Sequence, residues 1–194
     1  MSDHHHYILF KPHGYLSQFI YNGKRKSRKR LLGELHNFAE GTMAIGRLDE
    51  DSEGLLLLTT NGKISYEILS QKYEKEYHVQ VDGVIDEEAI ERLKNGIEIA
   101  IEGVKYMTKQ CKARLLDPPI FPERGKKIRD ERHGPTSWVA IILREGKFRQ
   151  VRKMTAASGF PTLRLVRVRI GDIWLKDMQP GEVTELDALI PVTD

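Results

Sequence analysis

The sequence predicts an α+β fold in which a mostly antiparallel, mixed sheet is flanked by helices. Apolar stretches of strand length outnumber those of helical periodicity, and the two kinds do not alternate in the regular order of a parallel α/β sheet. The chain has 194 residues, which suffices for one domain or for one domain with two lobes. Its 40% hydrophobic and 30% charged content is typical of a soluble globular protein.

The first part of the chain is expected to hold three strands and two helices. The strands are expected at HYILFK (6–11), MAIG (43–46) and LLLLTT (55–60). The helices are expected at RLLGELHNF (30–38), which has apolar residues at helical spacing, and over about 63–71. Asn61-Gly62 is a strong turn signal between the third strand and the second helix.

The second part is expected to hold six strands and two helices. The strands are expected at EYHVQV (76–81), 98–101, 104–108, 111–116, 137–145 and 162–171. The helices are expected at DEEAIERLKNG (86–96) and KFRQVRKMTAASG (147–159), each closed by a glycine. On the second helix an apolar stripe of Phe148, Val151, Met154 and Thr155 accompanies a cationic stripe of Arg149, Arg152 and Lys153. Residues 117–136 hold four prolines and nine charged side chains, which indicates a long loop that is either functional or disordered.

Composition narrows the class of protein. The longest apolar runs are far below the roughly 18 residues that a membrane span needs, and the N-terminus lacks the layout of a signal peptide. Cys111 is the only cysteine, so the chain can form neither an internal disulfide nor a zinc finger, which favours a reducing cytoplasm. The histidines of MSDHHH can be read as a metal-binding tract, but a disordered tail over residues 1–6 is the preferred interpretation.

Positive charge is concentrated in one segment, KRKSRKR (24–30). Its six cations are Lys24, Arg25, Lys26, Arg28, Lys29 and Arg30. The net charge of the chain is +3, so the remaining residues carry −3 once these six are set aside. Such a patch attracts a polyanion without reading its sequence, so contact with phosphates is the preferred interpretation; a solvated loop is the alternative.

An acidic cluster directly precedes a buried strand in GRLDEDSEGLLLLTTNG (46–62). Its residues Asp49, Asp51, Glu53 and Gly54 match the start of a calcium-binding EF-hand loop, but Thr60 occupies the twelfth position, where a bidentate carboxylate is required. Calcium binding is therefore a remote alternative.

Asp49 stands out among these acids because it lies between two apolar strands. A buried carboxylate needs a cationic or hydrogen-bonding partner to stay ionised. A guanidinium such as Arg152 could pair with it and lower its pKa below the usual value of about 3.9. The same pair could serve stability alone, and Tyr77 could likewise be an ordinary core residue.

Four motifs in order resemble those of the A-type RNA pseudouridine synthases named for the small ribosomal subunit. They are KPHGYLSQ (11–18), the acidic stretch GRLDEDSEGLLLLTTNG (46–62), KEYHVQV (75–81), and EGKFRQVRKM (145–154) with LRLVRVRIG (163–171). The resemblance covers essentially the whole chain. It implies the pseudouridine synthase catalytic fold, with two lobes around a cleft, and isomerisation of uridine in RNA without a metal or other cofactor.

The resemblance also implies roles for individual residues. Asp49 would be the catalytic carboxylate, paired with Arg152, and Tyr77 would stack on the uracil and help remove its C5 proton. Arg47 would fill the gap that the flipped base leaves in the RNA. Leu165 would pack beneath the pocket, and Lys11 of the lysine–proline motif would be among the substrate-binding residues, as would the cations of 24–30.

The lysine–proline motif begins at residue 11, whereas many family members carry an RNA-binding module before it. We therefore expect a tail over 1–6 and a catalytic domain over 7–194 without that module. This shorter form resembles members that act on 23S rRNA of the large ribosomal subunit. It implies an rRNA partner, no DNA or membrane partner, a monomer, and a cytoplasmic location. The main alternative is a non-catalytic rRNA-binding or ribosome-assembly factor with the same fold.

Overall fold

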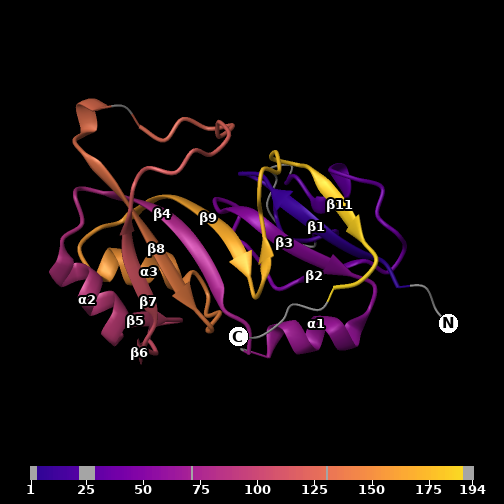
Figure 1. The fold of residues 1–194 in the computed structure, drawn as a ribbon, viewed down its shortest axis with the longest axis horizontal. Coiled ribbons are helices and arrows are strands. Elements are labelled where there is room, and N and C mark those ends of the chain that lie inside the picture. Colours follow the sequence, from indigo (N-terminus) through magenta and orange to yellow (C-terminus); the bar gives the residue numbers. More distant parts are fainter. Residues whose placement is uncertain (1–3, 22–28, 71, 130, 190–194) are drawn as a thin grey trace.

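The computed structural model describes residues 4–21, 29–70, 72–129 and 131–189. Within them, a nine-stranded mixed sheet runs through the molecule in the order β11-β1-β3-β9-β4-β8-β7, with β2 on β3 and β10 on β9 (Figure 1). Its strands are β1 (His6–Lys11), β2 (Met43–Ile45), β3 (Glu53–Thr59), β4 (Lys75–Asp82), β7 (Lys112–Leu116), β8 (Thr136–Leu143), β9 (Thr162–Ile170), β10 (Ile173–Trp174) and β11 (Val183–Leu186). Among the strands of this sheet in the described ranges, only β3 and β9 pair in parallel, so the predicted mostly antiparallel mixed sheet is confirmed.

Three α-helices of the described residues lie against this sheet, at three of the four segments that the sequence predicted as helical. They are α1 (Gly62–Leu69), α2 (Glu87–Asn95) and α3 (Gln150–Ala157). Asn61 caps α1 by accepting hydrogen bonds from two backbone N–H groups, and Asp86 caps α2 in the same way through the N–H of Ala89. A separate two-stranded sheet of β5 (Glu98–Ile101) and β6 (Val104–Met107) follows α2. The expected α+β class therefore holds.

The large sheet is shared by two lobes with separate apolar cores. One lobe contains β4, β7, β8, α2 and α3, and the other contains β1, β2, β3, β11 and α1 (Figure 1). The four leucines of β3 explain the apolar run in the sequence. Leu55 and Leu57 enter the core on one face of the sheet, while Leu56 and Leu58 enter the core on the other face. Because β3 is buried on both faces, it reads as an unbroken apolar stretch instead of an alternating one.

The lobes meet at the parallel pairing of β3 with β9, which we call the seam. It consists of two residue pairs, Glu53 with Val166 and Gly54 with Arg167. Gly54 has a φ of +108°, and a Cβ atom added there would lie 2.3 Å from the carbonyl oxygen of Arg167. Glycine is therefore required for the two backbones to approach this closely. Beside it, the buried carboxylate of Glu53 accepts two hydrogen bonds from Arg164, at 2.9 and 3.0 Å.

Two predicted helical features are wrong. The segment 30–38 forms only a single 3-10 turn, Leu32–Glu34, because its apolar side chains pack against β1 and β3 from an irregular backbone with a glycine in the middle. In the second case α3 begins at Gln150, three residues later than expected, so Phe148 is 64% exposed and does not join the buried stripe. The short strands β10 and β11 were not predicted at all.

The long loop between β7 and β8 is held to the body of the protein. Phe121 packs near His78 and Trp138, with ring centroids 6.0 and 5.8 Å away, and Arg129 forms an ion pair with Asp82. A 3-10 turn, Glu131–His133, is its only regular element among the described residues. Of the two options that the sequence left open, disorder is therefore not supported where this loop is described.

The predicted N-terminal tail (1–6) and the predicted first strand (6–11) overlap at His6. Residues 1–3 lie outside the described part of the chain, His6 belongs to β1, and the His5 ring contacts Glu185 at 2.6 Å. The strand prediction is therefore confirmed at residue 6, and the tail prediction is wrong there. The described residues contain no group of histidine, cysteine or acidic side chains able to hold a metal ion. None of the described helices is long and apolar enough to cross a membrane.

Candidate active site

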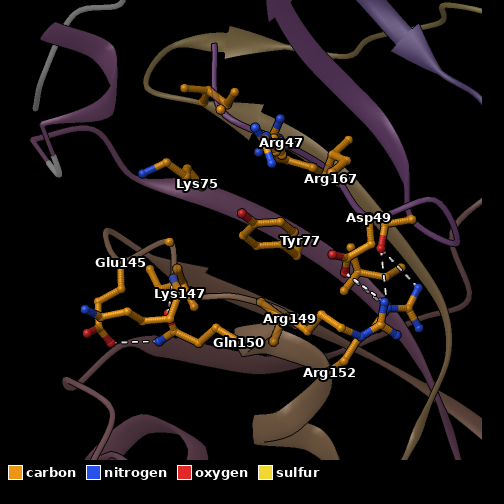
Figure 2. Close-up of a pocket in the computed structure, with 18 of the residues that line it drawn as sticks. Arg47, Asp49, Lys75, Tyr77, Glu145, Lys147, Arg149, Gln150, Arg152 and Arg167 are labelled. Atoms are coloured by element: carbon orange, nitrogen blue, oxygen red, sulfur yellow. Dashed lines mark hydrogen bonds and ion pairs between the residues drawn. The ribbon is translucent and has the colours of Figure 1, made fainter. Parts of the chain in front are cut away.

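A pocket opens where the two lobes meet, and it brings together five of the site residues that the sequence predicted (Figure 2). Its walls come from the acidic loop (residues 46–52, between β2 and β3), from β4, from the segment that begins α3, and from β9. The expected residues that line it are Arg47, Asp49, Tyr77, Arg152 and Leu165. Residues more than 100 positions apart in the chain thus share one cavity.

Residues of the lysine–proline motif (11–18) hold the acidic loop in place. The Ser17 hydroxyl donates to the carbonyl of Leu48 at 2.8 Å and accepts from the N–H of the same residue at 2.9 Å. Lys11 donates from Nζ to the carbonyl of Ser52 at 2.8 Å. Both contacts lie within a few residues of Asp49, so they fix the backbone that carries this carboxylate. No sequence signal pointed to this clamping role for Ser17.

Two arginines face two aspartates at this loop, and they bind them unequally. Arg149 donates two hydrogen bonds to Asp51, at 3.0 and 2.9 Å, and Arg152 donates to the Asp51 carbonyl at 2.8 Å. The same arginines approach Asp49 only as charges, with Oδ2 at 3.4 Å from Arg149 and 3.8 Å from Arg152. The expected pairing of Arg152 with Asp49 is present, but Arg149 is nearer. Among the described residues the Asp49 carboxylate accepts no hydrogen bond.

The pKa of Asp49 is raised, contrary to the expectation that its arginine partner would lower it. Burial is the largest cause, and the nearby Asp51 carboxylate adds to it, while Arg149, Arg152 and Lys11 oppose it. For Asp51 the balance is reversed. Burial again raises its pKa, but the hydrogen bonds from Arg149 and the charges of both arginines outweigh it, so the pKa is lowered. Long contacts to Asp49 therefore leave burial dominant.

Arg149 owes its position to an unusual backbone conformation. It adopts a left-handed φ of 52° directly before α3. This conformation takes Arg149 out of the helical stripe in which the sequence had placed it and turns the guanidinium toward the acidic loop. The sequence indicated a cationic stripe but not which arginine would lie closest to Asp49.

Tyr77 and Leu165 form the apolar floor of the pocket. Tyr77 comes from β4 and is 9% exposed, and it belongs both to the core of its lobe and to the pocket wall. Its hydroxyl has no hydrogen-bond partner among the described residues. Leu165, which is almost fully buried, comes from the neighbouring strand β9. A planar base could rest on this floor with its edges toward the charged walls.

Two of the expected substrate-binding residues differ in whether they reach the pocket: Arg47 lines it and Lys11 does not. Arg47 is exposed at the mouth of the pocket, with no ion pair to any described residue. Lys11 is fully buried, donates to two backbone carbonyls and does not line the pocket. Burial lowers its pKa to about 7, against the opposing pull of the neighbouring carboxylates. Its geometry suits it to holding the acidic loop and not to touching a substrate.

The basic segment 24–30 is only partly described. Lys24, Arg25, Lys26 and Arg28 lie outside the described residues. Lys29 forms an ion pair with Glu50 at 2.7 Å. Arg30 lies over the ring of Tyr15, with its guanidinium carbon 4.6 Å from the centroid. Both described cations therefore already have partners within the protein.

The calcium alternative has no support in this geometry. The carboxylate of Asp51 is bound by Arg149, and that of Glu53 is bound by Arg164. An EF-hand would need both as metal ligands.

Comparison with known proteins decides the family. The sequence matches the RNA pseudouridylate synthase family over residues 5–157. The chain belongs to this family. It is 42% identical over 181 residues to "Ribosomal large subunit pseudouridine synthase E" of Vibrio parahaemolyticus, covering 92% of this chain and 72% of that protein. It is 40% identical to the protein of the same name from Xanthomonas axonopodis pv. citri, covering 89% of each.

A solved structure, "Crystal structure of pseudouridylate synthase", shares the fold of this synthase. The TM-score is 0.76 at 26% identity, and the alignment covers 96% of this chain and 71% of that one. The pseudouridine synthase fold that the sequence motifs implied is therefore confirmed, as is the isomerase class. The two relatives described above carry large-subunit names, so the broad family is firmer than the A-type, small-subunit grouping that the motifs suggested.

Proposed function

We propose that this protein converts uridine to pseudouridine in 23S rRNA of the large ribosomal subunit, with Asp49 as the reacting carboxylate. The observation that carries the proposal is the unequal arginine binding: Asp51 holds Arg149 and Arg152, while Asp49, beside Tyr77, accepts no hydrogen bond from any described residue. A carboxylate with free lone pairs in a pocket wall can react, whereas one engaged by two hydrogen bonds is occupied.

The reaction breaks the bond from C1′ to N1 of the uridine and joins C1′ to C5. The base must leave its helical stack, because neither atom is accessible within an RNA helix. Asp49 acts either as a nucleophile at C1′ or as the base that takes the C2′ proton, and both routes use its free oxygens. The two arginines keep it ionised against the effect of burial, since their charges lower the pKa that burial raises.

Tyr77 and Arg47 complete the proposed handling of the base. The Tyr77 ring forms a platform on which the uracil stacks, and its hydroxyl, free of partners in the described residues, can assist removal of the C5 proton. Arg47 stands exposed at the mouth, where its planar cation can take the place of the flipped base in the RNA stack. Leu165 supports the floor from β9.

RNA contact by the basic segment is proposed for its cations at 24–28. Lys29 and Arg30 already have intramolecular partners and contribute charge at a distance. The loop over 117–136 is a second proposed contact. It carries several cations, of which Arg124 and Arg129 reach acids of the protein body. Removing the charges of 24–28 should weaken RNA binding and flatten its dependence on salt.

Finer assignments rest on the motifs and the relatives. The four motifs support the A-type branch named for the small ribosomal subunit, and the relatives' names support rRNA of the large subunit, as in synthase E. We further propose a catalytic domain that extends to residue 194 and acts as a monomer in the cytoplasm. We propose that it needs no metal or cofactor, because the isomerisation has no net redox change, and that it binds neither DNA nor membrane.

Tritium release tests this function directly. Large-subunit rRNA transcribed with uridine tritiated at C5 should lose tritium to water, because joining C1′ to C5 displaces that hydrogen. Wild type should release it, Asp49→Asn should not, and the control Asp177→Asn, an exposed acid outside the pocket, should match wild type. If wild type binds the rRNA but releases no tritium from transcripts or from large-subunit particles, the alternative of a non-catalytic rRNA-binding or assembly factor is correct.

A further inference from the structure

One end of the pocket holds two buried cations without an acidic partner. Lys75 and Arg167 are 8% and 3% exposed, and both line the pocket wall. The acids of that wall are Asp49, near Arg149 and Arg152, and Glu145. Glu145 is occupied by the N–H of Lys109 at 2.9 Å, by Gln150 at 2.7 Å and by a short contact with the Tyr106 hydroxyl. No carboxylate of the described residues forms an ion pair with either cation.

These two cations flank the proposed platform for the base. Lys75 lies two residues before Tyr77 on β4, so both side chains are on the same face of the strand. Arg167 is the residue directly opposite Tyr77 on β9. Figure 2 shows Tyr77 between Asp49 on one side and Lys75 on the other, with Arg167 above the ring. One end of the tyrosine thus carries Asp49 with its two arginines, and the other end carries cations that form no ion pair with a carboxylate of the described residues.

The hydrogen bonds of the two cations are incomplete. Lys75 donates to the carbonyls of Arg144 and Tyr73, at 3.0 and 3.4 Å. Arg167 donates from Nε to the carbonyl of Leu55 at 2.8 Å, but its Nη2 is buried and has no partner among the described residues. An unsatisfied buried donor costs about 1–3 kcal/mol, and more when it is charged. Burial, followed by the charges of Arg167 and Arg144, lowers the pKa of Lys75 to about 8.

A purely structural role accounts for only part of this arrangement. The Nε bond of Arg167 ties β9 to β3 next to the seam. It does not explain why a second cation is buried close enough to be repelled by the first, or why a donor is left unused. Unpaired buried charges of this kind gather where a bound ligand supplies the missing partner.

We propose that Lys75 and Arg167 form an oxyanion site for the uracil, which takes up the negative charge of the detached base. This inference rests on the proposed function. When the C1′–N1 bond breaks, its electron pair stays with N1 and spreads onto the O2 and O4 carbonyl oxygens. The base carries that charge until C5 bonds to C1′, which breaks the C1′–Asp49 bond in the nucleophilic route or returns the C2′ proton from Asp49 in the other route. The C5 proton then leaves to water, and N1 takes up a proton. No further reactant is required. Fixed donors at the site of developing charge lower the barrier without reorganisation.

Lys75→Met tests the site, because it keeps the length of the side chain and removes its charge. The turnover number on large-subunit rRNA should fall by about 10²-fold, while the dissociation constant for the RNA stays within about twofold of wild type. Lys63→Met, an exposed lysine on α1 outside the pocket, is the matched control and should leave both constants unchanged. The melting temperature of Lys75→Met should not fall, since a buried unpaired charge is removed.

A substrate with 5-fluorouridine at the target position separates charge stabilisation from a loss of structure. Fluorine withdraws electrons and makes the detached base less basic, so the base needs less help to leave. The defect of Lys75→Met should therefore be at least severalfold smaller for consumption of 5-fluorouridine than for uridine. Equal defects on the two substrates would overturn the oxyanion site.

Arg167→Gln, measured in the same way, decides the question if Lys75→Met does not fold; its defect must also shrink with the fluorinated base. Failure of the inference is distinguishable from failure of the proposed function. An active wild type with an unimpaired Lys75→Met removes only the oxyanion site. An inactive wild type on every large-subunit RNA removes the proposed function and the inference together.

Discussion

Two aspartates of the acidic loop differ in the direction of their pKa shifts, although the same two arginines contact both. Asp49 and Asp51 are two residues apart and both are partly buried, yet the pKa of Asp49 is raised and that of Asp51 is lowered. The difference lies in hydrogen bonding. Asp51 accepts two short bonds from Arg149, whereas Asp49 has the same guanidinium at 3.4 Å and Arg152 at 3.8 Å. One aspartate positions the cations, and the other remains available for chemistry.

Replacing each aspartate in turn with asparagine should distinguish these two roles most clearly by its effect on the turnover number. We expect Asp49→Asn to lower the turnover number by about 10³-fold or more, because the reacting oxygens are lost. Asp51→Asn should lower it by about 10- to 100-fold, through misplaced arginines. Single-turnover tritium release with saturating enzyme measures both. If Asp51→Asn were the more damaging change, the assignment of the two roles would be reversed.

The lysine beneath the loop should make stability depend on pH. The pKa of Lys11 is about 7 in the folded protein, against an ordinary value of 10.5. Between these values the unfolded chain binds more protons than the folded one, so the free energy of unfolding should rise with pH. The contribution of one group is at most about 1.4 kcal/mol per pH unit. Lys11→Met should remove this contribution.

Urea unfolding of wild type and Lys11→Met from pH 6 to pH 10 measures the difference. Lys75, whose pKa is about 8, adds a similar slope to both proteins and therefore cancels in the comparison. Parallel curves for the two proteins would show that Lys11 stays charged throughout, and that the loop above it supplies more compensation than its geometry suggests.

Asp49 also lines a groove on the protein surface, and an exposed aromatic residue of this groove, Phe148, should contact RNA. Phe148 lines this groove together with Arg47 and Lys147, and Lys153 lies 5.2 Å from the centroid of its ring. An exposed ring among cations suits stacking on a nucleotide. Phe148→Ala should weaken RNA binding by about tenfold. Its melting temperature should stay unchanged.

Filter binding at fixed salt measures this affinity. Tyr66→Ala, which removes a ring exposed to a similar degree on α1, is the matched control. An equal loss in both variants would mean that the groove beside Asp49 has no special contact with RNA.

The smallest expected effect is the opposite influence of the two aspartates on stability at acidic pH. Asp51, with a lowered pKa, stabilises the fold above the ordinary value of 3.8, and this contribution is lost as the pH falls. Asp49, with a raised pKa, destabilises the fold when ionised, and this cost disappears on acidification. At pH 7, Asp51→Asn should therefore lose about 0.5–1 kcal/mol, a value reduced by the solvent exposure of the pair. Asp49→Asn should be neutral or more stable.

Both differences from wild type should shrink as the pH falls below about 4, where the carboxyl groups are protonated in both states. Thermal unfolding from pH 3 to pH 7 follows them. A destabilised Asp49→Asn at neutral pH would contradict the raised pKa, and a shift of the same sign in both variants would remove the contrast between the two positions.

Local sequence signals predicted much of this fold. The capped helices α1 and α2 and the apolar strand β3 carry their signals within a few residues, so they were found. The segment 30–38 was misread because its leucines serve a core formed by distant strands and not a helix face. Strand β10 pairs across a tight turn and β11 pairs with a partner far along the chain, and both are too short to show a periodic pattern.

For the site, motif resemblance placed Asp49, Tyr77, Arg152 and Leu165 in one pocket, and their positions agree with that expectation. The predictions that were wrong depended on side-chain positions that differ by no more than a few ångströms. The direction of the Asp49 pKa shift follows from the difference between a hydrogen bond and a longer charge contact, which no spacing encodes. The left-handed backbone of Arg149 and the missing partner of Arg167 are likewise visible only in three dimensions.

Gly54 at the seam limits which substitutions the active site can tolerate. Asp49 lies between β2 and β3 of one lobe, Tyr77 lies on β4 of the other, and the backbones of those lobes are in contact where Gly54 faces Arg167. A single methyl group at this point would meet the carbonyl oxygen and the amide nitrogen of Arg167, at 2.3 and 2.7 Å, and would force the strands apart. Each core could still pack, while the carboxylate and the ring moved away from one another. The alignment of Asp49 with Tyr77 therefore depends on the absence of a Cβ atom at Gly54.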